Sequence, residues 1–179
     1  AIEKLISLTF DDGPHPEITP FVLQELEKYN AKATFFCIGK NVRDNEMVFK
    51  RILAEGHAVG NHTFDHLDGW KTKNATYISN VLKAREAIDS DLFRPPYGRI
   101  TNRQHKALTQ VANPFKIIMW SILSGDFDLT ISPEQCCKNV MKNTKSGSVI
   151  VFHDSEKAFD RMKFALPAIL KHFTEQGYL

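Results

Sequence analysis

The chain has 179 residues, 42% of them hydrophobic and 25% charged, and this composition suits one globular domain with a substantial core. Its net charge of +2 at pH 7 is too small to indicate a nucleic-acid surface. We therefore expect no nucleic-acid partner. No apolar run approaches the roughly 20 residues of a membrane-spanning helix, so we also expect no membrane span.

Short apolar runs alternate with amphipathic segments along the chain. Strands separated by helices imply parallel pairing with right-handed crossovers, in either a doubly wound sheet or a barrel. In chain order, we predict a strand at 6–10, a helix at 20–29, a strand at 33–38, a helix at 45–55, a strand at 58–60, a helix at 76–88, a short extended piece at Phe93, a helix at 102–109, a strand at 115–121, a helix at 133–142, a strand at 148–152 and a helix at 162–176.

The three cysteines do not form a disulfide framework. Cys136 and Cys137 are neighbours in a predicted helix, where a bridge between them would distort the backbone. Cys37 lies in an apolar run, and no spacing matches a zinc–thiolate site. We therefore expect three structural thiols. The N-terminus also lacks a basic segment followed by an apolar one, so we expect no signal peptide in this chain.

Two adjacent carboxylates, Asp11 and Asp12, end the first predicted strand just before a Gly-Pro turn. Adjacent side chains on an extended chain point in different directions, so one carboxylate can hold a metal while the other handles a proton. The ends of parallel strands are also where α/β folds place their chemistry. Taken alone, the pair favours a polar turn cap.

Two histidines, His62 and His66, follow the third predicted strand with three residues between them. On one face of a helical turn they lie close enough to share one metal, with a carboxylate as third ligand. Imidazole suits zinc and similar ions, and three protein ligands leave a position open for chemistry. The alternative is a pair of partly exposed histidines in a polar loop.

Four segments occur together in one order: TFDDGP at 9–14, HTFDH at 62–66, RPPYG at 94–98 and FHD at 152–154. They resemble successive signatures of the polysaccharide deacetylase family (NodB-homology domain, carbohydrate esterase family 4). The resemblance covers nearly the whole chain and implies a single catalytic domain over residues 1–179. The implied fold is an α/β distorted (β/α) barrel, commonly seven-stranded, and the implied activity is metal-dependent hydrolysis of acetyl groups on carbohydrate.

The resemblance assigns Asp12, His62 and His66 as ligands of a divalent metal, which we expect to be Zn2+, with Co2+ or Ni2+ as alternatives. It assigns Asp11 as the general base that takes a proton from the attacking water. Arg94 would orient this carboxylate and lower its pKa.

On the acid side, His153 resembles the family's general acid, and Asp126 would pair with it and hold it protonated. Tyr97 resembles the residue whose backbone N–H helps to stabilise the oxyanion, and its ring is a candidate substrate contact. Phe64, Trp70 and Phe127 are candidates for an apolar floor beneath the sugar or the acetyl methyl group, although for Trp70 we favour core or loop packing.

The chain departs from the family pattern at two positions. Leu123 stands where an aspartate is usual, and Phe127 stands where a tryptophan is usual. Phe127 keeps an aromatic surface but loses the indole N–H. These changes bear on substrate preference more than on the basic chemistry, because the predicted metal, base and acid residues all remain.

The leading hypothesis is a metal-dependent enzyme that deacetylates an N-acetylated glycan, either chitin-like or the peptidoglycan strand. Alternatives are an O-acetyl esterase on acetylated xylan, a metal-holding carbohydrate-binding protein without turnover, and a small-molecule amide hydrolase on the same barrel. Side-by-side acetate release from several substrates separates them. The family's usual substrates predict a secreted, periplasmic or envelope-associated protein, which we expect to be a monomer.

Overall fold

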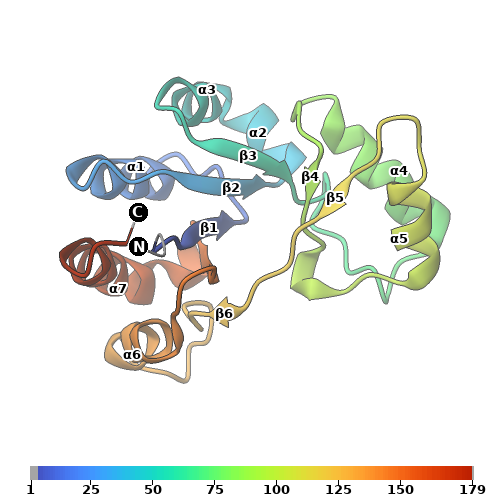
Figure 1. The fold of residues 1–179 in the computed structure, drawn as a ribbon. Helices are drawn as coiled ribbons and strands as arrows, with labels where there is room; N and C mark the ends of the chain where they lie inside the picture. The colour runs from blue at the N-terminus through green and yellow to red at the C-terminus, as the bar shows by residue number, and fades with distance from the viewer. Residues whose placement is uncertain (1–3, 179) are drawn as a thin grey trace. The chain divides into compact units, whose positions relative to one another are not determined.

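The computed structural model describes residues 4–178, within which seven strands, seven α-helices and one 3-10 helix follow one another along the chain (Figure 1). The strands form one sheet in the order β5-β4-β3-β2-β1-β7-β6. The strands are β1 (Ser7–Asp11), β2 (Ala33–Cys37), β3 (Ala58–Asn61), β4 (Leu92–Phe93), β5 (Lys116–Ile117), β6 (Ile122–Leu123) and β7 (Val149–His153). The helices are α1 (Ile18–Lys28), α2 (Gly39–Asp44), α3 (Glu46–Ala54), α4 (Asn74–Arg85), α5 (Asn102–Thr109), α6 (Pro133–Asn143) and α7 (Glu156–Glu175), and the 3-10 helix is η1 (Pro96–Gly98).

The strand pairings β1–β7, β6–β7, β3–β4 and β4–β5 are all parallel, as the alternation of strands and helices predicts. Contacts within the chain define two units. The first unit contains residues 4–11, 15–34 and 120–178, and the second contains residues 12–14 and 35–119.

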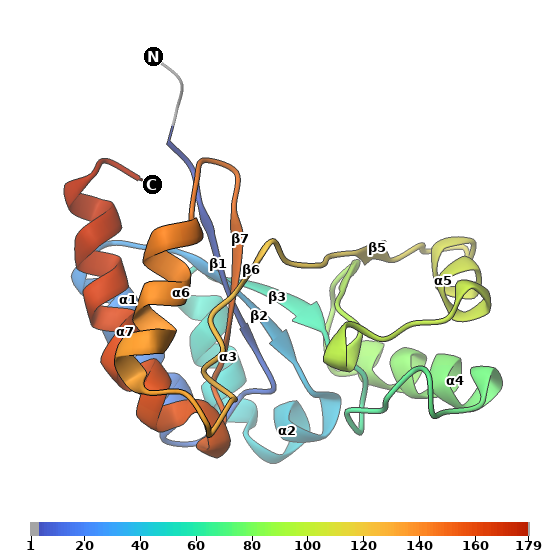
Figure 2. The same cartoon turned by 90° about the horizontal axis from the view of Figure 1, so that it is seen from below.

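The first unit is built on the parallel pair β1 and β7. Phe10 lies opposite Phe152 in the register, and their rings stack with centroids 5.9 Å apart at the centre of the core. Helix α7 contacts α1, α6 and β7, and Figure 2 shows α6 and α7 side by side. One further pair in this register, Asp11 opposite His153, places two polar side chains at the strand ends.

The second unit has its own apolar core around β4. The core cluster contains Tyr77 and Val81 from α4, Phe93 from β4, Leu108 from α5, and Phe115. Helices α4 and α5 contact each other, while α2 contacts α3 and α4. Their apolar faces therefore cover the short strands β3, β4 and β5, which are too short to be stable alone.

The predicted strand at 115–121 is largely wrong, because only Lys116–Ile117 pairs with β4. The Arg94 side chain donates hydrogen bonds to the carbonyls of Ile118 (3.0 Å) and Met119 (3.2 Å). The Arg94 side chain thus occupies carbonyls that a longer strand would have paired with a neighbouring strand. The two-residue strand β6 was not predicted, since two residues show no alternation.

Two helices also differ from the sequence-based expectation. The six-residue helix α2 was not predicted, because it buries only Gly39 and Val42 and shows no apolar stripe. Helix α7 begins at Glu156 and not at Met162. This first turn was hard to predict from the sequence, because the turn contributes only Ala158 to the core. The predicted helix at 102–109 is confirmed, and a capping box between Thr101 and Gln104 defines its start.

The three thiols are free and buried, as predicted. Burial raises the pKa of Cys136 to about 12 and also raises that of Cys137, so these thiols stay protonated and unreactive in the folded chain. Among residues 4–178, no helix is long and apolar enough to cross a membrane.

Replacing Tyr77 with Phe should stabilise the protein. The side chain is fully buried, its pKa is raised by desolvation, and the described residues provide no hydrogen-bond partner for its hydroxyl. We expect Tyr77→Phe to raise the free energy of unfolding by about 1–2 kcal/mol, measured by urea denaturation. The control Tyr29→Phe, at a partly exposed position, should change it by less than about 0.5 kcal/mol. A destabilised Tyr77→Phe variant would show that the hydroxyl has a partner in solution.

Candidate active site

Three predicted metal ligands converge in the second unit. Asp12 follows β1 in the chain, and His62 and His66 lie in the loop after β3. Their ligand atoms all lie within 4.8 Å of one another. Asp12 Oδ1 is 3.1 Å from His66 Nε2 and 3.5 Å from His62 Nε2. The structure therefore brings these three side chains together, as the sequence predicted.

The hydrogen bonding of His62 determines which ring nitrogen faces the cluster. His62 is 2% exposed, and its Nδ1 lies 2.7 Å from the backbone carbonyl of Arg94. A carbonyl can only accept, so Nδ1 carries the hydrogen and Nε2 keeps its lone pair. This second contact orients the ring for metal binding, as outer hydrogen bonds do in metal sites.

The donor set fits the metal that the sequence predicts. Two imidazole nitrogens and one carboxylate suit zinc and similar divalent ions, and three protein ligands leave room for a further ligand. Asp12 and His66 have partly exposed side chains, at 23% and 27%, whereas His62 is enclosed. An ion bound here would thus be held by the protein and still face solvent.

The two histidines do not lie on a helical turn, and that part of the prediction is wrong. The loop that contains them turns through left-handed residues, with φ of +63° at Thr63 and +56° at His66. Asp12 also has a left-handed backbone, with φ of +84°. Such a conformation costs about 1–3 kcal/mol for each non-glycine residue, and it persists only where the surroundings impose it.

Side-chain amides hold these strained turns in place. Asn61 Oδ1 accepts from the N–H of Thr63 (2.9 Å), and Asn80 Oδ1 on α4 accepts from the N–H of Phe64 (2.8 Å). Asn41 on α2 donates to the carbonyl of Asp12 (2.7 Å). Asn41 and Asn80 were not predicted, since an amide bound to backbone has no sequence signature.

Tyr97 lies beside the metal ligand His66 and, like Asp12, Thr63 and His66, has a left-handed backbone. Its φ is +60° within η1, and its ring contacts that of His66 with centroids 4.8 Å apart. The turn between Pro96 and Gly98 fixes the direction of the Tyr97 peptide, as its predicted oxyanion role requires. That role remains a prediction.

The acid candidate lies in the first unit. His153 ends β7, and its Nδ1 lies 2.8 Å from Oδ1 of the fully buried Asp126. The His153 N–H donates to the second carboxylate oxygen, Oδ2, at 2.7 Å. The structure thus places this pair together as predicted, and the Phe127 ring lies edge-on to His153 at 5.3 Å. With Nδ1 bound to a carboxylate, Nε2 is the nitrogen to which the predicted acid role would fall.

Two residues that support Asp126 were not predicted. Arg161 on α7 is 8% exposed and donates from Nε to the Asp126 carbonyl at 2.6 Å. Asn139 on α6 donates to the carbonyl of Ser124 at 3.0 Å. Between these contacts the chain passes through Gly125, whose φ of +79° favours glycine. Two helices therefore hold the loop that presents Asp126.

Two other predicted site residues are buried. Asp11 is 3% exposed, and Arg94 is fully buried with its guanidinium 4.1 Å from the centre of the Phe36 ring. Arg94 therefore does not form an ion pair on the protein surface. Its predicted pairing with Asp11 remains a prediction.

Two aromatic residues differ from their predicted roles. Phe64 is 6% exposed and packs beneath the amine of Lys83, which lies 3.8 Å from the ring centre, so it has little surface to offer a sugar. Trp70, which we interpreted as a packing residue, is 67% exposed.

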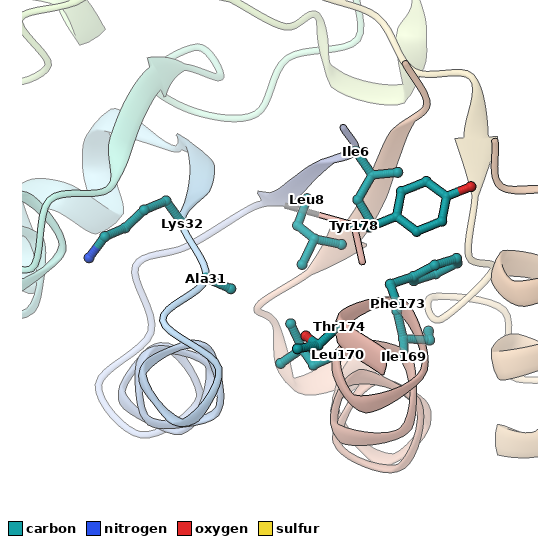
Figure 3. Close-up of a pocket in the computed structure, with 9 residues that line it drawn as sticks. All are labelled: Ile6, Leu8, Ala31, Lys32, Ile169, Leu170, Phe173, Thr174 and Tyr178. Atoms are coloured by element: carbon teal, nitrogen blue, oxygen red, sulfur yellow. The ribbon is translucent and has the colours of Figure 1, made fainter. Parts of the chain in front are cut away.

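An apolar hollow in the first unit is not part of this site. It encloses about 50 Å³ between β1, α7 and the loop before β2, too little space for a sugar ring (Figure 3). None of the nine side chains that line it is a predicted site residue. Those side chains are Ile6, Leu8, Ala31, Lys32, Ile169, Leu170, Phe173, Thr174 and Tyr178.

The parallel α/β fold, with two histidines and a carboxylate converging beside it, defines a hydrolase-like protein with a candidate metal centre. The chain belongs to the polysaccharide deacetylase family, whose model matches residues 1–114. This membership confirms the predicted family and the predicted enzyme class, a carbohydrate deacetylase.

Individual relatives agree with this assignment. The chain is 35% identical over 182 residues to a peptidoglycan-N-acetylglucosamine deacetylase of Bacillus cereus, covering 98% of this chain and 84% of the relative. It is 34% identical over 181 residues to a deacetylase of the same description from Listeria monocytogenes, but spans only 37% of that protein's length.

A solved structure confirms the predicted fold class, a distorted (β/α) barrel. The crystal structure of a peptidoglycan N-acetylglucosamine deacetylase in complex with 4-naphthalen-1-yl-N-oxidanyl-benzamide superposes with a TM-score of 0.92. The match has 33% sequence identity and covers 99% of this chain and 86% of the other.

Removing one metal ligand should abolish tight metal binding. We expect the metal-free protein to bind one Zn2+ or Co2+, and His66→Ala to weaken this binding on the order of 100-fold or more, measured by isothermal titration calorimetry. His105→Ala, at an exposed position on α5, should bind as the unmodified protein does. Unchanged affinity in His66→Ala would place the metal elsewhere.

Proposed function

We propose that the chain is a metal-dependent deacetylase of N-acetylglucosamine-containing glycans, either chitin-like or the peptidoglycan strand, and that it releases acetate. The observation that carries this proposal is the convergence of Asp12, His62 and His66, with Asp11 immediately before Asp12 in the chain. The Bacillus and Listeria relatives, which are named for peptidoglycan N-acetylglucosamine, support the choice of substrate.

The two adjacent aspartates have different roles: Asp12 is a metal ligand and Asp11 is the general base. Asp12 and the two histidines would hold a divalent ion, which would supply Lewis acidity and make a water more acidic. Asp11 takes a proton from the attacking water, whose oxygen forms the new bond to the acetyl carbon. We propose that the buried Arg94 orients this carboxylate.

The leaving group determines the need for an acid. An amide nitrogen leaves poorly unless it is protonated, so His153 donates a proton from Nε2 as the C–N bond breaks. Asp126 holds the opposite nitrogen, Nδ1, and so orients the ring for this transfer. The Tyr97 N–H stabilises the negative charge that develops on the acetyl oxygen. The products are acetate and the free amine of the sugar.

We propose zinc as the native metal, with cobalt or nickel able to replace it, because all three accept mixed imidazole and carboxylate ligands. Peptidoglycan and chitin-like substrates lie outside the cytoplasm, so we propose that the enzyme acts at the cell envelope or is secreted. We further propose that it acts as a monomer, since each ligand of the candidate metal site comes from a single chain.

Acetate release from a substrate panel tests the proposed activity. We expect release from N-acetylglucosamine oligomers or peptidoglycan to exceed that from acetylated xylan, to stop with chelator and to return with Zn2+. Asp11→Asn should lower the rate by about 10²–10⁴-fold, whereas Asp160→Asn, at an exposed site on α7, should not change it.

Two results would contradict this proposal. Dominant release from xylan would identify an O-acetyl esterase. Glycan binding without acetate release, whichever metal is added, would identify a binding protein without turnover.

The acid's contribution should depend on the leaving group. His153→Ala and Asp126→Asn should slow amide hydrolysis by about 10²–10³-fold, because the amine needs a proton to leave. Hydrolysis of 4-nitrophenyl acetate should fall much less, since its leaving group departs as a stable anion. Equal losses on both substrates would mean that His153 does not act as the acid.

A further inference from the structure

Three side chains, two of them exposed and one half-buried, form a strip beside the metal ligand His66, all within the second unit. The strip begins with Tyr97, which is 60% exposed and whose ring contacts that of His66. The guanidinium of Arg99 follows, 5.6 Å from the centre of the Tyr97 ring. Trp70 ends the strip, 67% exposed, with its ring centre 5.2 Å from the same guanidinium. The rings of Trp70 and Tyr97 thus both lie near the Arg99 guanidinium.

Local contacts hold Trp70 in this exposed position. Asp68 Oδ1 accepts from the Trp70 N–H at 2.9 Å, and the buried Gln104 donates to the Gly69 carbonyl at 2.8 Å. A Cβ at Gly69 would collide with the backbone carbonyl of Arg99, so the loop packs closely against that segment. The tryptophan is therefore presented by an ordered turn.

The strip also carries fixed polar groups. Arg99 Nη1 donates to Asp68 Oδ2 at 2.7 Å, which holds the guanidinium between the two rings. A sugar ring has an apolar face of C–H groups and a polar rim of hydroxyls. Flat aromatic side chains match the face, while a guanidinium and a carboxylate match the hydroxyls. An exposed indole has no comparable use as a packing residue.

We propose that Trp70, Arg99 and Tyr97 form a subsite that binds a sugar ring adjacent to the one whose acetyl group is removed. This inference relies on the proposed function only for the identity of the glycan, because the ligand chemistry follows from the strip itself. It implies that affinity increases from N-acetylglucosamine to its dimer, since the second ring reaches the strip while the first occupies the metal site.

Binding of the N-acetylglucosamine hexamer tests the subsite. The experiment uses zinc-loaded protein with Asp11→Asn, which blocks turnover and leaves the three metal ligands intact. Isothermal titration calorimetry should show that Trp70→Ala weakens hexamer binding about tenfold, while Trp70→Phe keeps it within about threefold of the parent. The gain in affinity from N-acetylglucosamine to its dimer should shrink in Trp70→Ala. Phe164→Ala, which removes an exposed aromatic ring from α7 in the first unit, should bind as the parent does.

The outcomes separate the subsite from the proposed activity. Circular dichroism should show unchanged thermal unfolding in the Trp70 variants, because the side chain is largely exposed. Equal hexamer affinity in Trp70→Ala and the parent, or no hexamer binding by the parent, would overturn the subsite. Because binding needs no turnover, a protein that binds through Trp70 but releases no acetate would retain the subsite and refute only the deacetylase activity.

Discussion

The candidate metal centre depends on strained backbone in its own loops. Asp12, Thr63 and His66 all have positive φ, and two of these three residues are metal ligands. A left-handed residue turns the chain sharply enough for side chains from separate loops to meet. The cost is offset by hydrogen bonds that Asn41 donates and that Asn61 and Asn80 accept, together with those along the parallel strands. We therefore expect the protein itself, and not the ion, to set the positions of the three ligands.

The Asp11–Asp12 pair connects this centre to the rest of the proposed chemistry. Asp12 is anchored to β2, where its N–H donates to the carbonyl of Phe36 at 3.2 Å. Asp11 belongs to β1 and lies opposite His153 in the register with β7. Asp12, a metal ligand, and Asp11, which pairs in register with the acid candidate His153, are thus joined by a single peptide bond. A change in the β1–β7 register would displace Asp11 relative to His153, so the buried Phe10–Phe152 stack also serves the site.

The sequence predicted the chemistry better than the local geometry. The ligands and the Asp126–His153 pair lie within short motifs whose residue types reveal their use. The helical turn assumed for the two histidines was wrong, because spacing alone does not report a positive φ. Arg161 could not have been predicted, since it acts on a backbone carbonyl and lies in a turn of α7 that shows little apolar periodicity. Trp70 was misjudged because hydrophobicity normally predicts burial, and only the structure shows its ring exposed.

Crystal structures of the metal-free and zinc-loaded protein test the central claim most directly. We expect anomalous scattering to place one zinc ion about 2.0–2.1 Å from Nε2 of His62 and of His66, and within about 2.2 Å of an Asp12 oxygen. We expect Asp12, Thr63 and His66 to keep their positive φ in the metal-free crystal. Zinc bound at other residues, or a metal-free chain in which these residues relax to negative φ, would contradict a preformed centre.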